Sequence, residues 1–222
     1  MELNTIFPFW SKLSPAHQER LMAAATERSI PAGTLLHNGS NDCIGLLGVK
    51  QGQLRVYTTS DEGKELTLYR LFERDMCLFS ASCMLKSIQF DVMVATEQDS
   101  VLIHIPAEVY QSLMAESLPV SNYTNELMAT RFSDVMWLMD QVMNKKMNAR
   151  VAALLLEEAE LADTTELHLT HDQLARHLGT AREVVTRMLK YFQSEGLLQL
   201  TRGSILLLEP DTLRESAADS LR

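Results

Sequence analysis

Residues 170–208 constrain the fold most strongly, because they have the pattern of two packed helices followed by a short hairpin. Gly179 can take the left-handed backbone conformation that ends a helix without a steric penalty. Thr180, directly after it, is a suitable N-cap for a second helix. Glu195-Gly196 ends that second helix, and two strand-like runs follow it, 197–201 and 204–208. The order of helix, turn, helix and hairpin predicts a winged helix-turn-helix.

The second helix of this segment separates its residues by chemistry. At about 100° per residue, Val185, Leu189 and Phe192 fall on one side and can pack against the first helix. The opposite side is polar and has groups that can hydrogen-bond to base edges and phosphates. An ordinary amphipathic surface helix would show the same separation, but the flanking helix and hairpin favour DNA binding. The predicted DNA-binding residues are Thr170, Thr180, Arg182, Glu183, Thr186, Arg187, Lys190 and Arg202.

The net charge of the chain is −9, which by itself argues against a polyanionic partner. The distribution of charge matters more than its sum. Residues 170–208 contain five basic and three acidic residues, a net charge of +2, so the acidity lies elsewhere. This small excess indicates that DNA affinity depends on two copies acting together and falls as salt is added.

Other features of the composition limit the class of protein. No run of 18 apolar residues occurs, so we expect no membrane span. The first ten residues lack the basic region of a signal peptide. Cys43, Cys77 and Cys83 are too few for a disulfide framework, which indicates a cytoplasmic protein. No Gly-rich phosphate loop, carboxylate pair or nucleophile elbow is present, so we predict no enzyme.

The histidines show no spacing that would hold a metal ion together with cysteines or carboxylates, so we predict no metal site. His171 and His177 are expected beside the DNA backbone or in solvent.

Residues 13–106 have the pattern of a β-rich domain. Turn signals recur at roughly ten-residue spacing, and the short runs between them alternate apolar and polar residues. Short, regularly spaced strands of this kind predict a small barrel or β-roll. Pro106 ends the strand-like pattern.

A long helix is predicted from residue 118 to about 148, because this stretch has no Gly and no Pro after Pro119. Such a helix would be about 45 Å long. Its apolar residues are spaced as in a heptad repeat, and the β-branched members favour a two-stranded pairing. The stripe could instead pack on the chain's own β-domain, but Met136 and Met143 supply a second apolar edge, so both contacts can be made. The predicted dimer-interface residues are Met128, Phe132, Val135, Met139 and Val142.

The helix-turn-helix motif resembles that of the Crp/Fnr transcription regulators, and the resemblance covers about residues 10–210. Arg182-Glu183-Val184-Val185-Thr186-Arg187 is similar to the Arg-Glu-Thr-Val-Ser-Arg that this family commonly carries. The resemblance implies a cytoplasmic homodimer that binds double-stranded DNA at a palindromic operator, responds to a small-molecule effector and has RNA polymerase as a partner. It also implies that Arg182, Glu183 and Arg187 read the inner bases of a TGA-like half-site.

The expected fold class is therefore α+β, in three parts. Residues 1–117 would form a sensor domain with the double-stranded β-helix (β-roll) of the cyclic-nucleotide-binding type. Residues 118–146 would form the dimerisation helix, with a hinge at Asn144-Lys145-Lys146. Residues 147–222 would form the winged helix DNA-binding domain.

The expected sensor departs from the better-known members of the family. Cyclic AMP is not expected, because Phe79 occupies the position of a phosphate-binding glutamate and residues 86–90 contain no arginine. A four-cysteine iron–sulfur cluster is excluded by the absence of cysteine from residues 1–42. The haem-based carbon monoxide sensor of the family has its axial ligands where this chain has Leu78 and Ser80. Cys77 could replace only one of those ligands, so haem is a weak alternative.

Cys77 and Cys83 are possible sensing residues through thiol chemistry, which requires an exposed thiolate of low pKa. Their apolar neighbours favour two inert core cysteines instead. The effector therefore stays unassigned. An alternative function is a haem- or thiol-based redox or gas sensor whose winged helix docks a protein rather than DNA.

Overall fold

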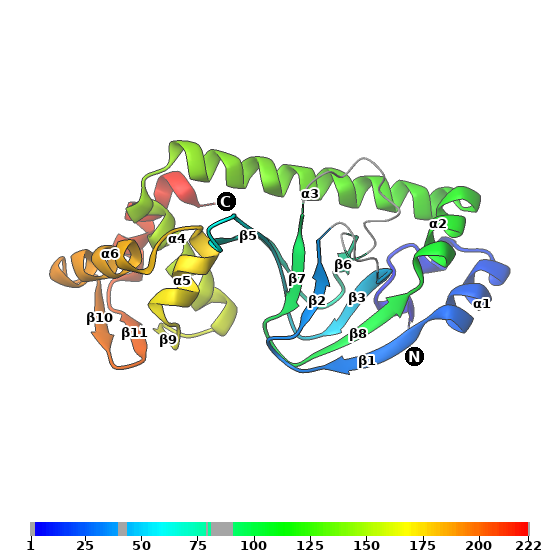
Figure 1. The fold of residues 1–222 in the computed structure, drawn as a ribbon, viewed down its shortest axis with the longest axis horizontal. Helices are drawn as coiled ribbons and strands as arrows, with labels where there is room; N and C mark the ends of the chain where they lie inside the picture. Colours follow the sequence, from blue (N-terminus) through cyan, green and yellow to red (C-terminus); the bar gives the residue numbers. More distant parts are fainter. Residues whose placement is uncertain (1–2, 40–43, 79, 81–90, 222) are drawn as a thin grey trace. The chain divides into compact units, whose positions relative to one another are not determined.

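A computed structural model describes residues 3–39, 44–78, 80 and 91–221 (Figure 1). The chain divides into two compact units. Unit 1 consists of Met1–Thr59 and Leu68–Val135, and unit 2 consists of Ser60–Thr67 and Met136–Arg222. Each unit has its own core.

Unit 1 is built on two four-stranded sheets, with strand orders β1-β8-β3-β6 and β2-β7-β4-β5. Val49 and Leu102 of the first sheet and Val56 and Val94 of the second are buried in one apolar cluster. The two sheets therefore pack face to face, which confirms the predicted β-roll. The strands are β1 (Thr26–Ile30), β2 (Leu35–Asn38), β3 (Leu46–Gln51), β4 (Leu54–Thr59), β5 (Glu65–Leu71), β6 (Met76–Cys77), β7 (Met93–Thr96) and β8 (Ser100–Ile105). The first three residues of β5 belong to unit 2.

Helices and the N-terminal turns cover the outer face of the first sheet. Helix α1 (Pro15–Ala24) begins at Ser14, whose side chain accepts a hydrogen bond from the His17 backbone. Helix α2 (Ala107–Glu116) follows β8 directly. Phe7, Leu21 and Tyr110 are buried in one cluster with residues of β3 and β8, so this second core fixes the N-terminal segment to the roll. The short turns are η1 (Leu3–Thr5) and η2 (Trp10–Lys12).

Helix α3 (Leu118–Asn144) is the longest element, and it contributes residues to both units. It ends at the predicted hinge, four residues before the predicted helix end. Its 27 residues give a length of about 40 Å. Of the predicted interface residues, Phe132, Met139 and Val142 are 68 %, 48 % and 46 % exposed. Val135 is half-buried, and Met128 packs against the core of unit 1.

Unit 2 contains a core of four helices with a small antiparallel sheet of order β10-β11-β9 (Figure 1). Leu155, Leu174 and Leu189 from three different helices are fully buried together. This arrangement confirms the predicted winged helix-turn-helix, with strands within one residue of their expected bounds. Its elements are α4 (Met147–Ala162), β9 (Glu166–Leu167), α5 (His171–Leu178), α6 (Arg182–Ser194), β10 (Leu198–Thr201), β11 (Ser204–Leu207), α7 (Pro210–Ala217) and η4 (Ala218–Ser220).

None of the helices within the described residues is both long enough and apolar enough to cross a membrane.

Candidate nucleic-acid interface

The turn between α5 and α6 is fixed by the backbone. Gly179 ends α5 in the left-handed region, with φ of 66°. The N–H groups of Gly179 and Thr180 both donate to the carbonyl of Ala175, and the bond from Thr180 is the 6→1 bond of a Schellman motif. The prediction that Thr180 is the N-cap of α6 is therefore wrong. Ala181 is the N-cap, and it makes no side-chain cap bond.

Arg150 provides a second support for this turn, which no local sequence pattern predicts. Its guanidinium Nη2 donates to the carbonyl oxygen of Leu178 at 2.8 Å, and both groups are buried. This carbonyl is one of those at the end of α5 that have no partner within the helix. Burial lowers the pKa of the Arg150 guanidinium. The one available signal in the sequence was an arginine inside the otherwise apolar run 149–156.

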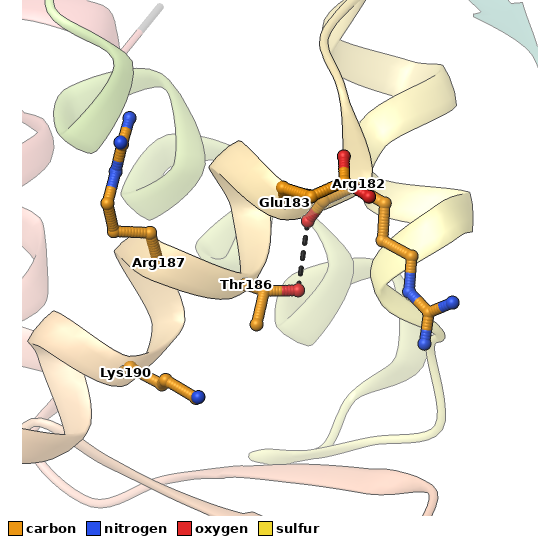
Figure 2. A pocket seen from close by; sticks show the side chains of 5 residues that line it. All are labelled: Arg182, Glu183, Thr186, Arg187 and Lys190. Atoms are coloured by element: carbon orange, nitrogen blue, oxygen red, sulfur yellow. Dashed lines mark hydrogen bonds between the residues drawn. The ribbon is translucent and has the colours of Figure 1, made fainter.

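Helix α6 presents the predicted polar side chains together. Val185, Leu189 and Phe192 are buried in the core of unit 2, as the sequence indicated. The opposite side of the helix forms a depression of about 460 Å³, lined by five of the predicted DNA-binding residues (Figure 2). These residues are Arg182, Glu183, Thr186, Arg187 and Lys190.

The other three predicted residues lie at element ends rather than in the depression. Thr170 is the N-cap of α5 and forms a capping box with Gln173. Thr180 is in the turn, half-buried. Arg202 is exposed in the two-residue loop of the β10–β11 hairpin, next to the pair formed by Thr201 and Ser204.

The guanidinium of Arg182 is only weakly engaged within the protein. Arg182 Nη1 lies 3.8 Å from a carboxylate oxygen of Asp172, and the two side chains are 62 % and 57 % exposed. An exposed pair at this distance contributes little to stability. The Arg182 guanidinium can therefore exchange this carboxylate for a base edge or a phosphate at small cost.

His171, which the sequence places beside the DNA backbone or in solvent, makes a contact within the protein. It is half-buried, and its Nδ1 lies 2.8 Å from the Thr186 hydroxyl oxygen. Burial lowers the pKa of the His171 imidazole. The positive charges of Arg182 and Lys190 lower this pKa further, while Asp172 opposes them. His177 instead has its Nδ1 2.9 Å from the hydroxyl of Thr67, within unit 2.

The predicted sensing residues are only partly described. Cys77 is fully buried in β6, and Cys83 lies outside the described residues, as do Cys43 and Phe79. Ser80, one of the compared haem-ligand positions, is buried and donates its hydroxyl to the carbonyl of Cys77. Within the described part of the chain, no group of three or more His, Cys, Asp and Glu residues could hold a metal ion.

Comparison with known proteins agrees with this geometry. Residues 149–216 match the model of the Crp-like helix-turn-helix domain. A solved structure from Eubacterium rectale ATCC 33656, described as a candidate transcriptional regulator of the Crp/Fnr family, is 53 % identical to the chain. The match covers 96 % of this chain and 99 % of that one, with a TM-score of 0.94. The chain belongs to the Crp/Fnr family.

More distant proteins match over most of their length. The cyclic AMP receptor protein of Thermus thermophilus is 25 % identical over 210 residues, which are 95 % of this chain and 96 % of that protein. The c-di-GMP-responsive global regulator of Xanthomonas campestris has the same fold, with a TM-score of 0.72 and 22 % identity, covering 87 % of this chain and 99 % of that one. This Crp/Fnr protein is accordingly a DNA-binding transcription regulator.

The substitution Arg150→Met tests the support of the turn. It leaves the buried carbonyl of Leu178 without its donor, so we expect the free energy of unfolding to fall by about 2 kcal/mol. Urea unfolding followed by circular dichroism measures this loss. Arg202→Met, at an exposed position, should stay within about 0.5 kcal/mol of the parent. Equal losses in the two variants would contradict the assigned role.

The lowered pKa of His171 predicts a pH dependence of stability. Because the pKa in the folded state lies below the ordinary 6.5, the unfolded state takes up the proton first as the pH falls. The stabilisation from neutral His171 is present above pH 6.5 and is lost as the pH falls through the folded-state pKa. His171→Asn should therefore lose less unfolding free energy than the parent between pH 7.5 and 5.5 in urea titrations. Identical losses would show that His171 is not the responsible group.

Proposed function

We propose that this regulator acts as a homodimer on a palindromic operator, with α6 of each copy in the major groove. The observation that carries the proposal is the set of five side chains around one depression on the exposed side of α6. An α-helix fits the major groove of B-form DNA, and its base edges present donors and acceptors that these residue types can bind. The role is regulatory rather than enzymatic.

The residues divide into two proposed roles. Arg182 and Arg187 have guanidinium groups that can bind guanine O6 and N7, and Glu183 can accept from the amino group of cytosine. These residues would read the G·C pairs of a TGA-like half-site. The remaining residues would contact phosphates and fix the register of the protein on the DNA. They are Lys190 and the three residues at element ends, Thr170, Thr180 and Arg202.

Helix α3 is the proposed dimer interface. Phe132, Met139 and Val142 follow the heptad spacing and are all substantially exposed in the single chain. Met136 and Met143, 42 % and 70 % exposed, extend this apolar surface. A second copy of the same helix would bury both stripes in a two-stranded pairing. The dimer would then present two α6 helices to half-sites about 34 Å apart.

A signal bound in the β-roll would control DNA binding by shifting the equilibrium between two conformations of the dimer, which differ in the spacing of their α6 helices. An effector changes DNA affinity only if it binds one arrangement more tightly than the other. The sequence lacks the expected phosphate-binding side chains at Phe79 and residues 86–90, so the proposed effector is not cyclic AMP. RNA polymerase is the proposed protein partner at the promoter.

Selection from a randomised double-stranded DNA pool tests the operator and its readout. The parent protein should retain a palindrome with TGA-like half-sites. Arg182→Ala should cost about 1–3 kcal/mol and relax the preference at one base pair of each half-site. The matched variant Arg202→Ala should weaken binding to all sequences similarly, because a phosphate contact carries no sequence information.

Each failure of this selection has a separate meaning. Retained sequences without two-fold symmetry would contradict the homodimer on a palindrome. Uniform weakening by Arg182→Ala would make Arg182 a phosphate contact. No retained sequence, with or without reductant and with cell extract added as a source of effector, would favour a winged helix that docks protein.

Phe132→Glu tests the dimer interface. Two buried Phe side chains contribute about 4 kcal/mol to such a dimer, and the substitution also brings two carboxylates together. We expect a monomer by light scattering at micromolar concentration and a loss of operator affinity. Ser133→Glu places the same charge at the next exposed position and should remain dimeric. A dimeric Phe132→Glu protein would show that the copies associate elsewhere.

A further inference from the structure

The hydroxyl group of Thr186 is held by two hydrogen bonds inside the protein. It donates to the carbonyl oxygen of Arg182 at 2.9 Å, and its oxygen lies 2.8 Å from Nδ1 of His171 (Figure 2 shows the first bond). A hydroxyl has one hydrogen and two acceptor positions. Because a carbonyl oxygen can only accept, we assign the Thr186 hydrogen to the Arg182 carbonyl, and in this assignment Nδ1 of His171 carries a hydrogen and donates it to Thr186.

This arrangement changes what Thr186 can offer to DNA. Guanine O6, purine N7 and thymine O4 in the major groove all require a donor, and the donor of Thr186 is already used. Thr186 lines the α6 depression, and in Figure 2 the methyl arm of its side chain points away from the bonded hydroxyl. The apolar group that base pairs present in the major groove is the C5-methyl of thymine.

We propose that Thr186 selects thymine through contact between the two methyl groups, and that His171 is the positioning residue that holds Thr186 in this orientation. The proposal rests on the proposed function, because it requires α6 to enter a major groove. Serine, which the family commonly carries at this position, has the hydroxyl but no methyl. The methyl of Thr186 is thus a feature of this chain rather than of the shared motif.

His171 is well placed for this role. It is the first residue of α5, directly after Thr170, and the capping box of Thr170 with Gln173 fixes its backbone. Threonine in a helix has two accessible side-chain rotamers, which place the methyl group in different positions. The bonds from His171 and to Arg182 together favour one of them.

The charges around His171 support a neutral donor. Asp172 on α5 and Arg182 and Lys190 on α6 are the charged groups that act on the imidazole. Its pKa is lowered, so at neutral pH the ring supplies a hydrogen-bond donor without adding a charge to the interface. The positioning of Thr186 is therefore maintained at the pH at which the regulator would bind DNA.

Replacing thymine by deoxyuridine, which lacks only the C5-methyl, tests the proposal. The probe is the operator obtained by selection, with each thymine of the half-site replaced in turn and affinity measured by fluorescence anisotropy at one salt concentration. The parent should lose about fourfold in affinity per half-site at one thymine, the equivalent of one buried methyl group. For each protein, the result is the ratio of its affinity for the thymine probe to its affinity for the uracil probe. A reduced active fraction of a variant affects both affinities equally and leaves this ratio unchanged.

Three kinds of variant separate the methyl from the hydroxyl. Thr186→Ser keeps the hydroxyl and should show equal affinity for thymine and uracil at that position. Thr186→Val keeps a methyl and should retain the fourfold ratio. His171→Ala should reduce the ratio, and His171→Asn, whose amide can donate in place of Nδ1, should restore it, whereas a merely structural role of His171 would change both affinities alike.

The result that overturns the proposal is distinct from failure of the proposed function. A parent protein that binds a palindrome tightly but does not distinguish thymine from uracil at any position contradicts only the methyl contact. Full discrimination by Thr186→Ser, or its loss in Thr186→Val, would assign the reading to another group or to the hydroxyl. Absence of any sequence preference would contradict the operator proposal itself, and with it the methyl contact.

Discussion

The geometry of the DNA-binding unit depends on the turn between α5 and α6. Gly179 reverses the chain in a conformation that a side chain would strain, and the buried guanidinium of Arg150 binds the last carbonyl of α5. These two interactions set where α6 begins. Because α6 also buries Val185, Leu189 and Phe192, its polar side can face only outward. The position of every proposed base contact therefore follows from a turn that itself contacts no base.

The sequence predicted the parts of the fold that depend on periodicity and on strong local signals. The two sides of α6, the hairpin around Arg202-Gly203 and the break at Asn144 all follow from spacing, glycine or polarity within a few residues. The β-roll followed from regularly spaced turns, although the pairing of its strands, such as β3 with β8, was not visible in the sequence. Strand pairing of this kind joins residues far apart in the chain, so no local pattern specifies it.

The candidate site was predicted less completely, since side-chain hydrogen bonds depend on the folded neighbourhood. Thr180 has the usual chemistry of an N-cap, but the chain uses its N–H to close the preceding helix. His171 could be placed near DNA by its position in the motif, whereas its bond to Thr186 requires the crossing of two helices. Arg150 is 28 residues from the carbonyl that it binds. For these three residues, the neighbouring sequence was insufficient to predict the hydrogen-bond partner.

The hairpin that follows α6 has a geometric consequence for the evolution of this domain. Thr201 pairs directly with Ser204, so Arg202 and Gly203 form a loop with no spare residue. Inserting a single residue into a strand would turn its side chains to the opposite face and expose Ile205 and Leu207, which belong to the core. The paired strands of the wing can therefore lengthen in register only by two residues each. Each such step moves the basic tip by about 7 Å, so lengthening of the strands changes the reach of the wing in discrete steps.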